Sequence, residues 1–228
     1  MDQFKRILIV TGHYGSGKTN AAVNLALRLA AEGKEPVTII DLDIVNPYFR
    51  TADFRRQLEE AGVRVITPVY ANTNLDSPVL PPEISGIFRP DSGYAVIDVG
   101  GDDAGAIALG QFSSRIQAAG YEMFYVINEK RYLTRNADAA AELLSEIETT
   151  SRLTATKIIN NTNLGEETTL DLVKASLPYA DRVCEITGLP LAFTCIDRRI
   201  PGADTLPGAF LTDILVRQSM ISSSDYSE

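Results

Sequence analysis

The glycine-rich segment Gly12–Thr19 constrains the fold more than any other part of this chain, because it satisfies the pattern G-x-x-x-x-G-K-[ST]. An apolar run, Ile7–Val10, precedes the segment, and an amphipathic stretch, Thr19–Ala31, follows it. A strand, a glycine-rich turn and a helix in this order form the context in which the pattern builds an anion-binding loop. The main-chain N–H groups of the loop and the positive end of the helix would then face a phosphate.

The residue types of this loop, the P-loop, predict a site for a nucleotide with Mg²⁺. Glycines let the backbone wrap around phosphate groups, with the amide groups pointing inward. Lys18 is expected to bridge the β- and γ-phosphates, and the Thr19 hydroxyl is expected to hold Mg²⁺. The predicted nucleotide-binding residues here are Gly12, His13, Tyr14, Gly15, Ser16, Gly17, Lys18 and Thr19.

Apolar runs and amphipathic stretches alternate along the rest of the chain, which predicts an α/β fold. The expected strands are Ile7–Val10, Val37–Ile40, Val63–Ile66, Ala95–Val99, Met123–Ile127, Thr156–Ile159 and Leu191–Cys195. The expected helices are Thr19–Ala31, Phe54–Ala61 and Asn136–Ile147. This alternation predicts a doubly wound, mostly parallel sheet. We expect a single P-loop domain over residues 1–221, with a long loop over Tyr70–Pro90 and a polar tail over 222–228.

Carboxylates stand at the ends of two expected strands. Asp41 and Asp43 follow the second strand, and Asp98 follows Ala95–Ile97 with Gly100 and Gly101 behind it. The carboxyl ends of strands meet at the ligand crevice of an open α/β sheet. We therefore predict that Asp98 and Asp41 support Mg²⁺ and that Asp43 positions the attacking water. If the second strand continues, Asp41 and Asp43 face the same way.

Composition excludes several classes of protein. The net charge is −9, which disfavours binding to nucleic acid. Cys184 and Cys195 are the only cysteines and there is one histidine, so an intrachain zinc or iron–sulfur ligand set is not expected. No apolar stretch is long enough to span a membrane. These features together predict a soluble cytoplasmic protein.

The chain resembles the ATPases of the MinD/ParA type and the wider group that includes cobyrinic-acid amidases and dethiobiotin synthetase. The matching residues are Gly12–Thr19, Asp41-Leu42-Asp43 and Asp98-Val99-Gly100-Gly101, in the order that the family has them. The resemblance covers the first half well and the second half loosely. It implies ATP and Mg²⁺ as cofactors, Lys18 and Asp43 as catalytic residues, and metal ligation by Thr19, Asp41 and Asp98.

The resemblance also implies a base-binding region in the second half. Lys157–Asn161 resembles the strand whose terminal asparagine reads adenine, so Asn160 is the preferred base contact and Asn161 the second choice. Leu191–Arg198, which contains Asp197, resembles the loop that flanks the purine. The chain has Asn163 where related GTPases use an aspartate to recognise guanine, so the sequence favours ATP over GTP.

One position departs from the family. The MinD/ParA proteins carry a second lysine directly after the first glycine of the P-loop, and this chain has His13 there. In the family that lysine reaches the phosphates of a partner subunit, so its absence weakens the expectation of an ATP-bound dimer. Protonated His13 and Arg50 are candidate substitutes. The basic cluster Lys130, Arg131 and Arg135 is interpreted as the solvated start of a helix.

Three functions remain open from the sequence. The first is a switch ATPase that regulates or assembles a partner protein and that forms a nucleotide-dependent homodimer or acts alone. The second is an ATP-dependent ligase or amidase acting on a small carboxylic acid, whose substrate would be covered by Tyr70–Pro90. The third is a metal-centre maturation ATPase, in which cysteines would be shared across a dimer interface.

Overall fold

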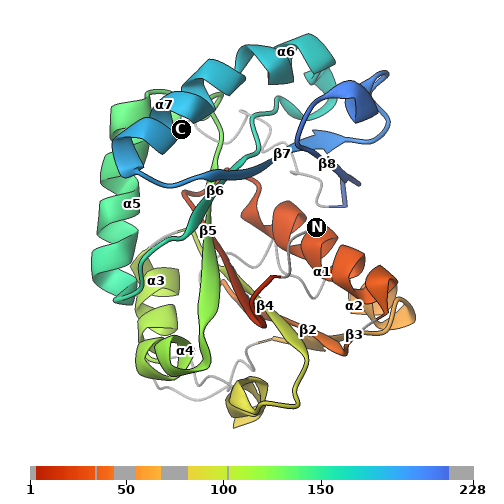
Figure 1. Ribbon diagram of the computed structural model, residues 1–228, viewed down its shortest axis with the longest axis vertical. Helices are drawn as coiled ribbons and strands as arrows, with labels where there is room; N and C mark the ends of the chain where they lie inside the picture. Colours follow the sequence, from red (N-terminus) through yellow and green to blue (C-terminus); the bar gives the residue numbers. More distant parts are fainter. Residues whose placement is uncertain (1–3, 34, 44–54, 68–81, 102, 216–228) are drawn as a thin grey trace, which may run out of the picture.

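The computed structural model of the chain describes residues 4–33, 35–43, 55–67, 82–101 and 103–215, which form a sheet with helices on both faces (Figure 1). Within these residues, eight strands pair in the order β3-β2-β4-β1-β5-β6-β7-β8. All of these pairings are parallel. The strands are β1 (Ile7–Thr11), β2 (Val37–Leu42), β3 (Val63–Ile66), β4 (Tyr94–Val99), β5 (Tyr121–Ile127), β6 (Lys157–Asn160), β7 (Leu191–Asp197) and β8 (Ala209–Thr212).

The helices divide between the two faces of the sheet. One face is covered by α1 (Lys18–Glu32) and α2 (Arg55–Glu60). The opposite face is covered by α3 (Asp103–Gly110), α4 (Ser113–Ala119), α5 (Ala137–Ser151) and α7 (Leu177–Thr187). The short helix α6 (Leu170–Ala175) precedes α7. Four 3₁₀ helices are also described, at Pro82–Phe88, Tyr132–Thr134, Gly165–Glu167 and Ala203–Thr205.

Two apolar cores follow from this layering, one on each side of the sheet. Along β1, Ile7 and Ile9 point into the core beneath α4 and α5, whereas Leu8 and Val10 point into the core beneath α1. A parallel strand covered on both faces needs apolar residues at every position, which explains the unbroken apolar runs. Each fully buried leucine or isoleucine contributes roughly 1.5–3 kcal/mol of transfer free energy.

The predicted fold class is confirmed, and every expected strand is present. β6 begins and ends one residue later than expected, which places Asn160 inside the strand. The sequence reasoning missed β8, α3, α4, α6 and α7. The expected helix at Phe54–Ala61 is present as Arg55–Glu60, while Phe54 lies outside the described residues. Arg50, most of Tyr70–Pro90 and the tail 222–228 also lie outside them, although Pro82–Phe88 of that expected loop is helical.

The topology creates a crevice at the carboxyl end of β1. β1 lies between β4 and β5, and the chain leaves β1 onto one face of the sheet through α1. The chain leaves β4 onto the opposite face through α3. Connections that diverge in this way open the binding crevice of doubly wound sheets. None of the described helices is both long and apolar enough to cross a membrane.

Candidate nucleotide site

The P-loop between β1 and α1 has a backbone that its glycines make possible. Gly15 and Gly17 have φ values of 76° and 86°, in the left-handed region that side chains disfavour. A Cβ atom on Gly12 would lie 2.5 Å from the main-chain O of Val126, and one on Gly17 would lie 2.2 Å from Nδ2 of Asn161. The glycines of the motif are therefore required both by conformation and by close contact with β5 and with the loop after β6.

Lys18 and Thr19 form the first turn of α1 and are almost completely buried. Nζ of Lys18 donates a hydrogen bond to the main-chain O of His13 at 3.2 Å, so the side chain lies back across the loop. The ring of His13 makes a different contact, in which its Nδ1 donates to the main-chain O of Tyr14 at 2.9 Å. The ammonium group of Lys18 is thus held inside the loop, where a phosphate would be enclosed.

Two buried carboxylates stand beside the P-loop. Asp41 of β2 and Asp98 of β4 are paired in register on adjacent strands, and they are 0 % and 1 % exposed. β2 ends at Leu42, so Asp43 does not continue the strand. Instead, the main-chain N of Asp43 donates to Oδ1 of Asp41 at 2.9 Å. The structure therefore brings the three predicted carboxylates together, but by a turn rather than along one strand face.

The Asp98 carboxyl has an abnormal proton affinity. Burial, with the neighbouring charge of Asp41 adding to it, raises the pKa of Asp98 to about 8, while Lys18 and the Thr19 hydroxyl act in the opposite direction. Both side-chain oxygens of Asp98 are buried, and neither makes a hydrogen bond of normal geometry with the described part of the chain. A buried carboxylate in such a position is a candidate for binding a cation.

Mg²⁺ fits this donor set when a nucleotide supplies the remaining ligands. Among the described residues there is no group of three or more His, Cys, Asp or Glu side chains arranged to hold a metal by themselves. Mg²⁺ bound with a nucleotide takes one or two protein oxygens and completes its shell with phosphate and water. The Thr19 hydroxyl and the Asp98 carboxylate would be those protein ligands, with Asp41 beside them.

The loop after β4 closes over the P-loop at Gly101. A Cβ atom there would lie 2.6 Å from the main-chain N of Tyr14 and 2.7 Å from Nζ of Lys18. A cavity of about 330 Å³ adjoins this contact, and its lining includes His13, Glu146 of α5, Gly100, Gly101 and Asp103. The loop after β4 therefore lies against the P-loop lysine.

Asn160 does not lie where a base contact was expected. Its side chain is fully buried, donates to Oγ of Ser176 at 2.9 Å and accepts from N and Oγ1 of Thr162 at 3.1 and 2.8 Å. Binding a base would break these bonds, because β6 extends through Asn160 and turns this side chain into the fold. The geometry therefore argues against Asn160 as the adenine contact.

Asn161, the second choice, lies against the P-loop instead. Its Nδ2 donates to the main-chain O of Ser16 at 2.7 Å and occupies the space beside Gly17. The residue thus ties the loop after β6 to the phosphate-binding loop.

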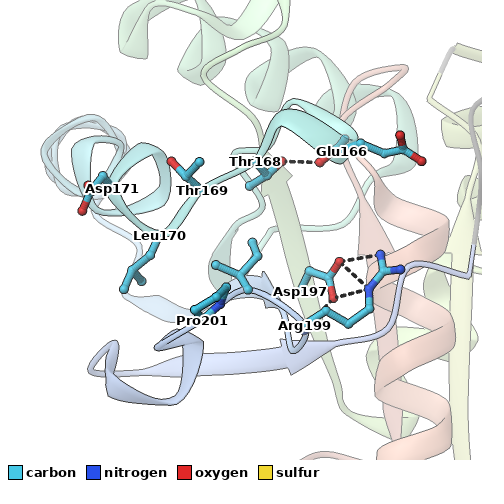
Figure 2. A pocket seen from close by; sticks show the side chains of 10 residues that line it. Glu166, Thr168, Thr169, Leu170, Asp171, Asp197, Arg199 and Pro201 are labelled. Carbon is cyan, nitrogen blue, oxygen red and sulfur yellow. Dashed lines mark hydrogen bonds and ion pairs between the residues drawn. The ribbon is translucent and has the colours of Figure 1, made fainter.

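Asp197 lines a cavity of about 680 Å³ at the carboxyl ends of β6 and β7. Figure 2 shows Asp197 joined to Arg199 on one side of this cavity, with Thr168 and Thr169 across from them. Nη2 of Arg199 lies 2.6 Å from Oδ2 of Asp197. Hydrogen bonding by Arg199 lowers the pKa of Asp197, so its carboxylate is ionised and already engaged.

The two cysteines belong to no cluster of three or more potential metal ligands among the described residues. Cys184 lies in α7 and Cys195 is buried in β7, and both are unbridged. Burial raises the pKa of the Cys195 thiol to about 12, and burial also raises the pKa of Cys184. Thiols with raised pKa values are poor nucleophiles at neutral pH.

Arg131 is a site residue that the sequence reasoning did not select. It was interpreted as part of a solvated helix start, yet the structure places its guanidinium on the P-loop at Gly15. No sequence motif marks this contact. The available signal was that Arg131 follows β5, whose carboxyl end lies beside that of β1.

No family model matches the chain, and no curated protein matches it. Solved structures do share its fold. Signal recognition particle 54 kDa protein from Aeropyrum pernix, solved with GDP, superposes with a TM-score of 0.57 at 18 % identity over 85 % of this chain and 42 % of that one.

Chloroplast FtsY from one organism and the cell division protein FtsY from another share the fold to a similar degree. Chloroplast FtsY from Physcomitrella patens gives a TM-score of 0.56 at 14 % identity, over 85 % of this chain and 59 % of that one. The cell division protein FtsY from Thermotoga maritima gives a TM-score of 0.51 at 20 % identity, over 87 % of this chain and 64 % of that one. The chain thus spans less than two thirds of these proteins, and the likeness shows a shared α/β fold.

Proposed function

We propose that this protein is a switch NTPase that binds Mg-ATP at Gly12–Thr19 and hydrolyses it slowly while it regulates or assembles a partner. One observation carries the proposal: the loop after β4 meets the P-loop at Gly101, against Lys18, beside the buried carboxylate of Asp98. A γ-phosphate bound by Lys18 would have to be accommodated at this contact. Occupancy of the site would thereby move the loop, which is how phosphate-sensing switches work.

The chemistry is hydrolysis of the terminal phosphoanhydride. A water oxygen bonds to the γ-phosphorus while the bond from that phosphorus to the bridging oxygen breaks, which releases ADP, and the proton passes to phosphate or solvent. Asp43 would orient the water, and Lys18 would stabilise the charge on the phosphates. Mg²⁺, held by Thr19 and Asp98 with support from Asp41, would supply further charge neutralisation.

The base would enter the cavity that Asp197 lines. Its volume of about 680 Å³ suits a small-molecule ligand, and Leu170, Ile200 and Pro201 provide apolar surface. The P-loop and this cavity are two to three strands apart, roughly 10–15 Å at about 4.8 Å per strand. One nucleotide can therefore extend across both.

Adenine is favoured over guanine by the state of Asn163. Its Nδ2 donates to the main-chain O of Asn161 at 2.7 Å, and its Oδ1 accepts from the main-chain N of Gly165 at 3.2 Å. Because both ends of the Asn163 side chain already make hydrogen bonds within the turn, the side chain is less available to contact a base. Asn163 also lacks the carboxylate that guanine recognition uses. The GDP in the similar structure from Aeropyrum pernix makes GTP the alternative to test.

Isothermal titration of the purified protein with ATP, ADP, GTP and GDP, with and without Mg²⁺, tests the proposal. We expect binding that Lys18→Ala abolishes, an ATP affinity above that for GTP, and slow phosphate release that requires Mg²⁺. Hydrogen exchange should show different protection around Gly100 and Gly101 with an ATP analogue and with ADP. The absence of binding by all four nucleotides would refute the proposal, and tighter binding of GTP would refute the base assignment.

A substrate-driven enzyme is a second candidate because of the 330 Å³ cavity beside Gly101. Its described lining includes Asp103 and Glu146, which would repel the carboxylic acid that a ligase or amidase of the expected type would take. An amine-bearing substrate would fit this charge better. Stimulation of phosphate release by small amines, but not by small acids, would favour this candidate over the switch.

A further inference from the structure

The guanidinium of Arg131 lies against the P-loop at Gly15. The site at which a Gly15 side chain would begin is 3.3 Å from Nε, 3.5 Å from Cζ and 3.6 Å from Cδ of Arg131. Gly15 is one of the residues whose main-chain N–H groups line the P-loop. The absence of a side chain at Gly15 therefore leaves room for the cation to approach the loop directly.

The turn that carries Arg131 is fixed by hydrogen bonds. The main-chain N of Arg131 and Oγ1 of Thr134 both donate to the main-chain O of Asn128, at 3.1 and 2.8 Å. The main-chain N of Thr134 in turn donates to the O of Arg131 at 3.1 Å. Asn128 is fully buried at the end of β5, so the backbone that presents Arg131 is held by the core of the domain.

The same network reaches the P-loop by a second route. The main-chain N of Glu129 donates to Oγ1 of Thr162 at 3.1 Å, beside Asn161, whose amide holds the main-chain O of Ser16 at 2.7 Å. Three loops, after β1, β5 and β6, are thereby linked. Arg131 thus has a defined position relative to the phosphate-binding groups, which a freely solvated arginine would lack.

We propose that Arg131 contacts phosphate oxygens of the bound nucleotide from within the same subunit, and that it supplies the second cation that the resembling ATPases place at the position of His13. The proposal rests on the proposed function. The planar guanidinium suits phosphate oxygens, because it offers several donors in a fixed geometry. His13 is a weaker candidate, since its Nδ1 already donates to the main-chain O of Tyr14.

The neighbouring cations provide matched controls. Arg135 lies 4.9 Å from the centroid of the Tyr132 ring and is exposed, and Nζ of Lys130 pairs with Oε2 of Glu129 at 2.7 Å. Arg135→Gln removes the same charge from the same kind of side chain four residues along. Lys130→Gln removes the charge of the adjacent residue.

The experiment compares wild type, Arg131→Gln, Arg131→Lys, Arg135→Gln and Lys130→Gln in titrations with Mg-ATP and Mg-ADP over a range of salt concentrations. We expect Arg131→Gln to lose affinity by roughly ten- to a hundredfold, as removal of a charged hydrogen bond does. Its salt dependence of binding should also become shallower. Arg131→Lys should recover part of both, and the two controls should match wild type.

The thermal midpoints of the nucleotide-free variants separate contact from folding. We expect Arg131→Gln to unfold at the wild-type temperature. Wild-type affinity in Arg131→Gln would overturn the inference while leaving the proposed function intact. An equal loss in Arg131→Lys and Arg131→Gln, with a lowered midpoint in both, would assign Arg131 to packing and would also overturn it. If wild type binds no nucleotide, both proposals fall.

Discussion

Gly101 shows how a single missing side chain sets the geometry of the site. A Cβ atom there would overlap the main-chain N of Tyr14, at 2.6 Å, and the end of Lys18. Lys18 can move, but the backbone of the P-loop cannot yield without displacing its phosphate-binding groups. We expect Gly101→Ala to lower the rate of nucleotide hydrolysis roughly 100-fold, the scale of a misplacement of about 1 Å. Single-turnover phosphate release measures this loss.

Gly86→Ala is the matched control for Gly101→Ala. A Cβ atom on Gly86 would meet nothing within 4 Å, and the residue is not among the glycines with positive φ. We expect this variant to hydrolyse nucleotide at the wild-type rate. If Gly101→Ala did the same, the loop after β4 would have room to move freely, and its proposed role in sensing the γ-phosphate would be wrong.

Asp98 predicts a pH dependence of stability in the nucleotide-free, metal-free protein. Its folded pKa is raised to about 8, above the value near 3.8 of an exposed carboxyl, so the folded state holds the proton more tightly than the unfolded state. The contribution of Asp98 to stability is therefore highest below the unfolded pKa and falls as pH rises towards 8. The fall is at most about 1.4 kcal/mol per pH unit.

Asp98→Asn isolates this contribution, because the amide keeps the shape and cannot ionise. We would measure the free energy of unfolding by urea from pH 5 to pH 8 in the presence of a metal chelator. The variant should become more stable relative to wild type as pH rises. With saturating Mg-nucleotide, wild type should instead be more stable than Asp98→Asn, because its carboxylate then binds the cation. A constant difference across the pH range would show that Asp98 does not titrate there.

Asn160 and Asn161 show which features of single residues the sequence could not predict. The expected strand ended at Ile159, before Asn160 and Asn161, and the resemblance made Asn160 the preferred base contact. Which of the two side chains faces the P-loop depends on where β6 ends, because a shift of one residue reverses the direction of every side chain. Likewise, the sequence alone suggests that Lys130 and Arg131 are both exposed charges. That Arg131 contacts the P-loop while Lys130 pairs with Glu129 becomes visible only once β5 is packed beside β1.

Among the elements, the junction between β6 and α1 depends on Asn161. Its amide holds the main-chain O of Ser16, and loss of this bond leaves a buried carbonyl without its donor. We expect Asn161→Ala to lower the free energy of unfolding by roughly 1–3 kcal/mol and to weaken nucleotide binding about tenfold or more. Chemical denaturation and titration calorimetry measure the two effects.

Asn136→Ala separates stability from binding. Oδ1 of Asn136 caps α5 by accepting from the main-chain N of Asp138 at 2.8 Å, and loss of such a cap costs about 1 kcal/mol. This variant should be destabilised but should bind nucleotide as wild type does. Equal binding losses in the two asparagine variants would mean that affinity follows global stability, not the P-loop contact.

The elements that the sequence predicted are those with a strong local signal. Apolar runs buried on both faces identify the seven expected strands, and Asn136 with its alanine-rich successor identifies α5. β8 was missed because its four residues, Ala209–Thr212, follow proline and glycine and pair only at the edge of the sheet. α3 was missed because Gly105 and Gly110 reduce its helical propensity, and its helical state depends on packing against α5.

For the whole molecule, the position of Arg131 determines what to expect of assembly. If the second cation is supplied in cis, triphosphate binding needs no lysine from a partner subunit, and dimerisation gains no free energy from that contact. We expect light scattering to give the same mass with ADP and with a non-hydrolysable ATP analogue, and hydrolysis per molecule to be independent of protein concentration. A dimer that forms only with the ATP analogue, and that Lys18→Ala prevents, would instead show that a partner subunit completes the nucleotide-binding site.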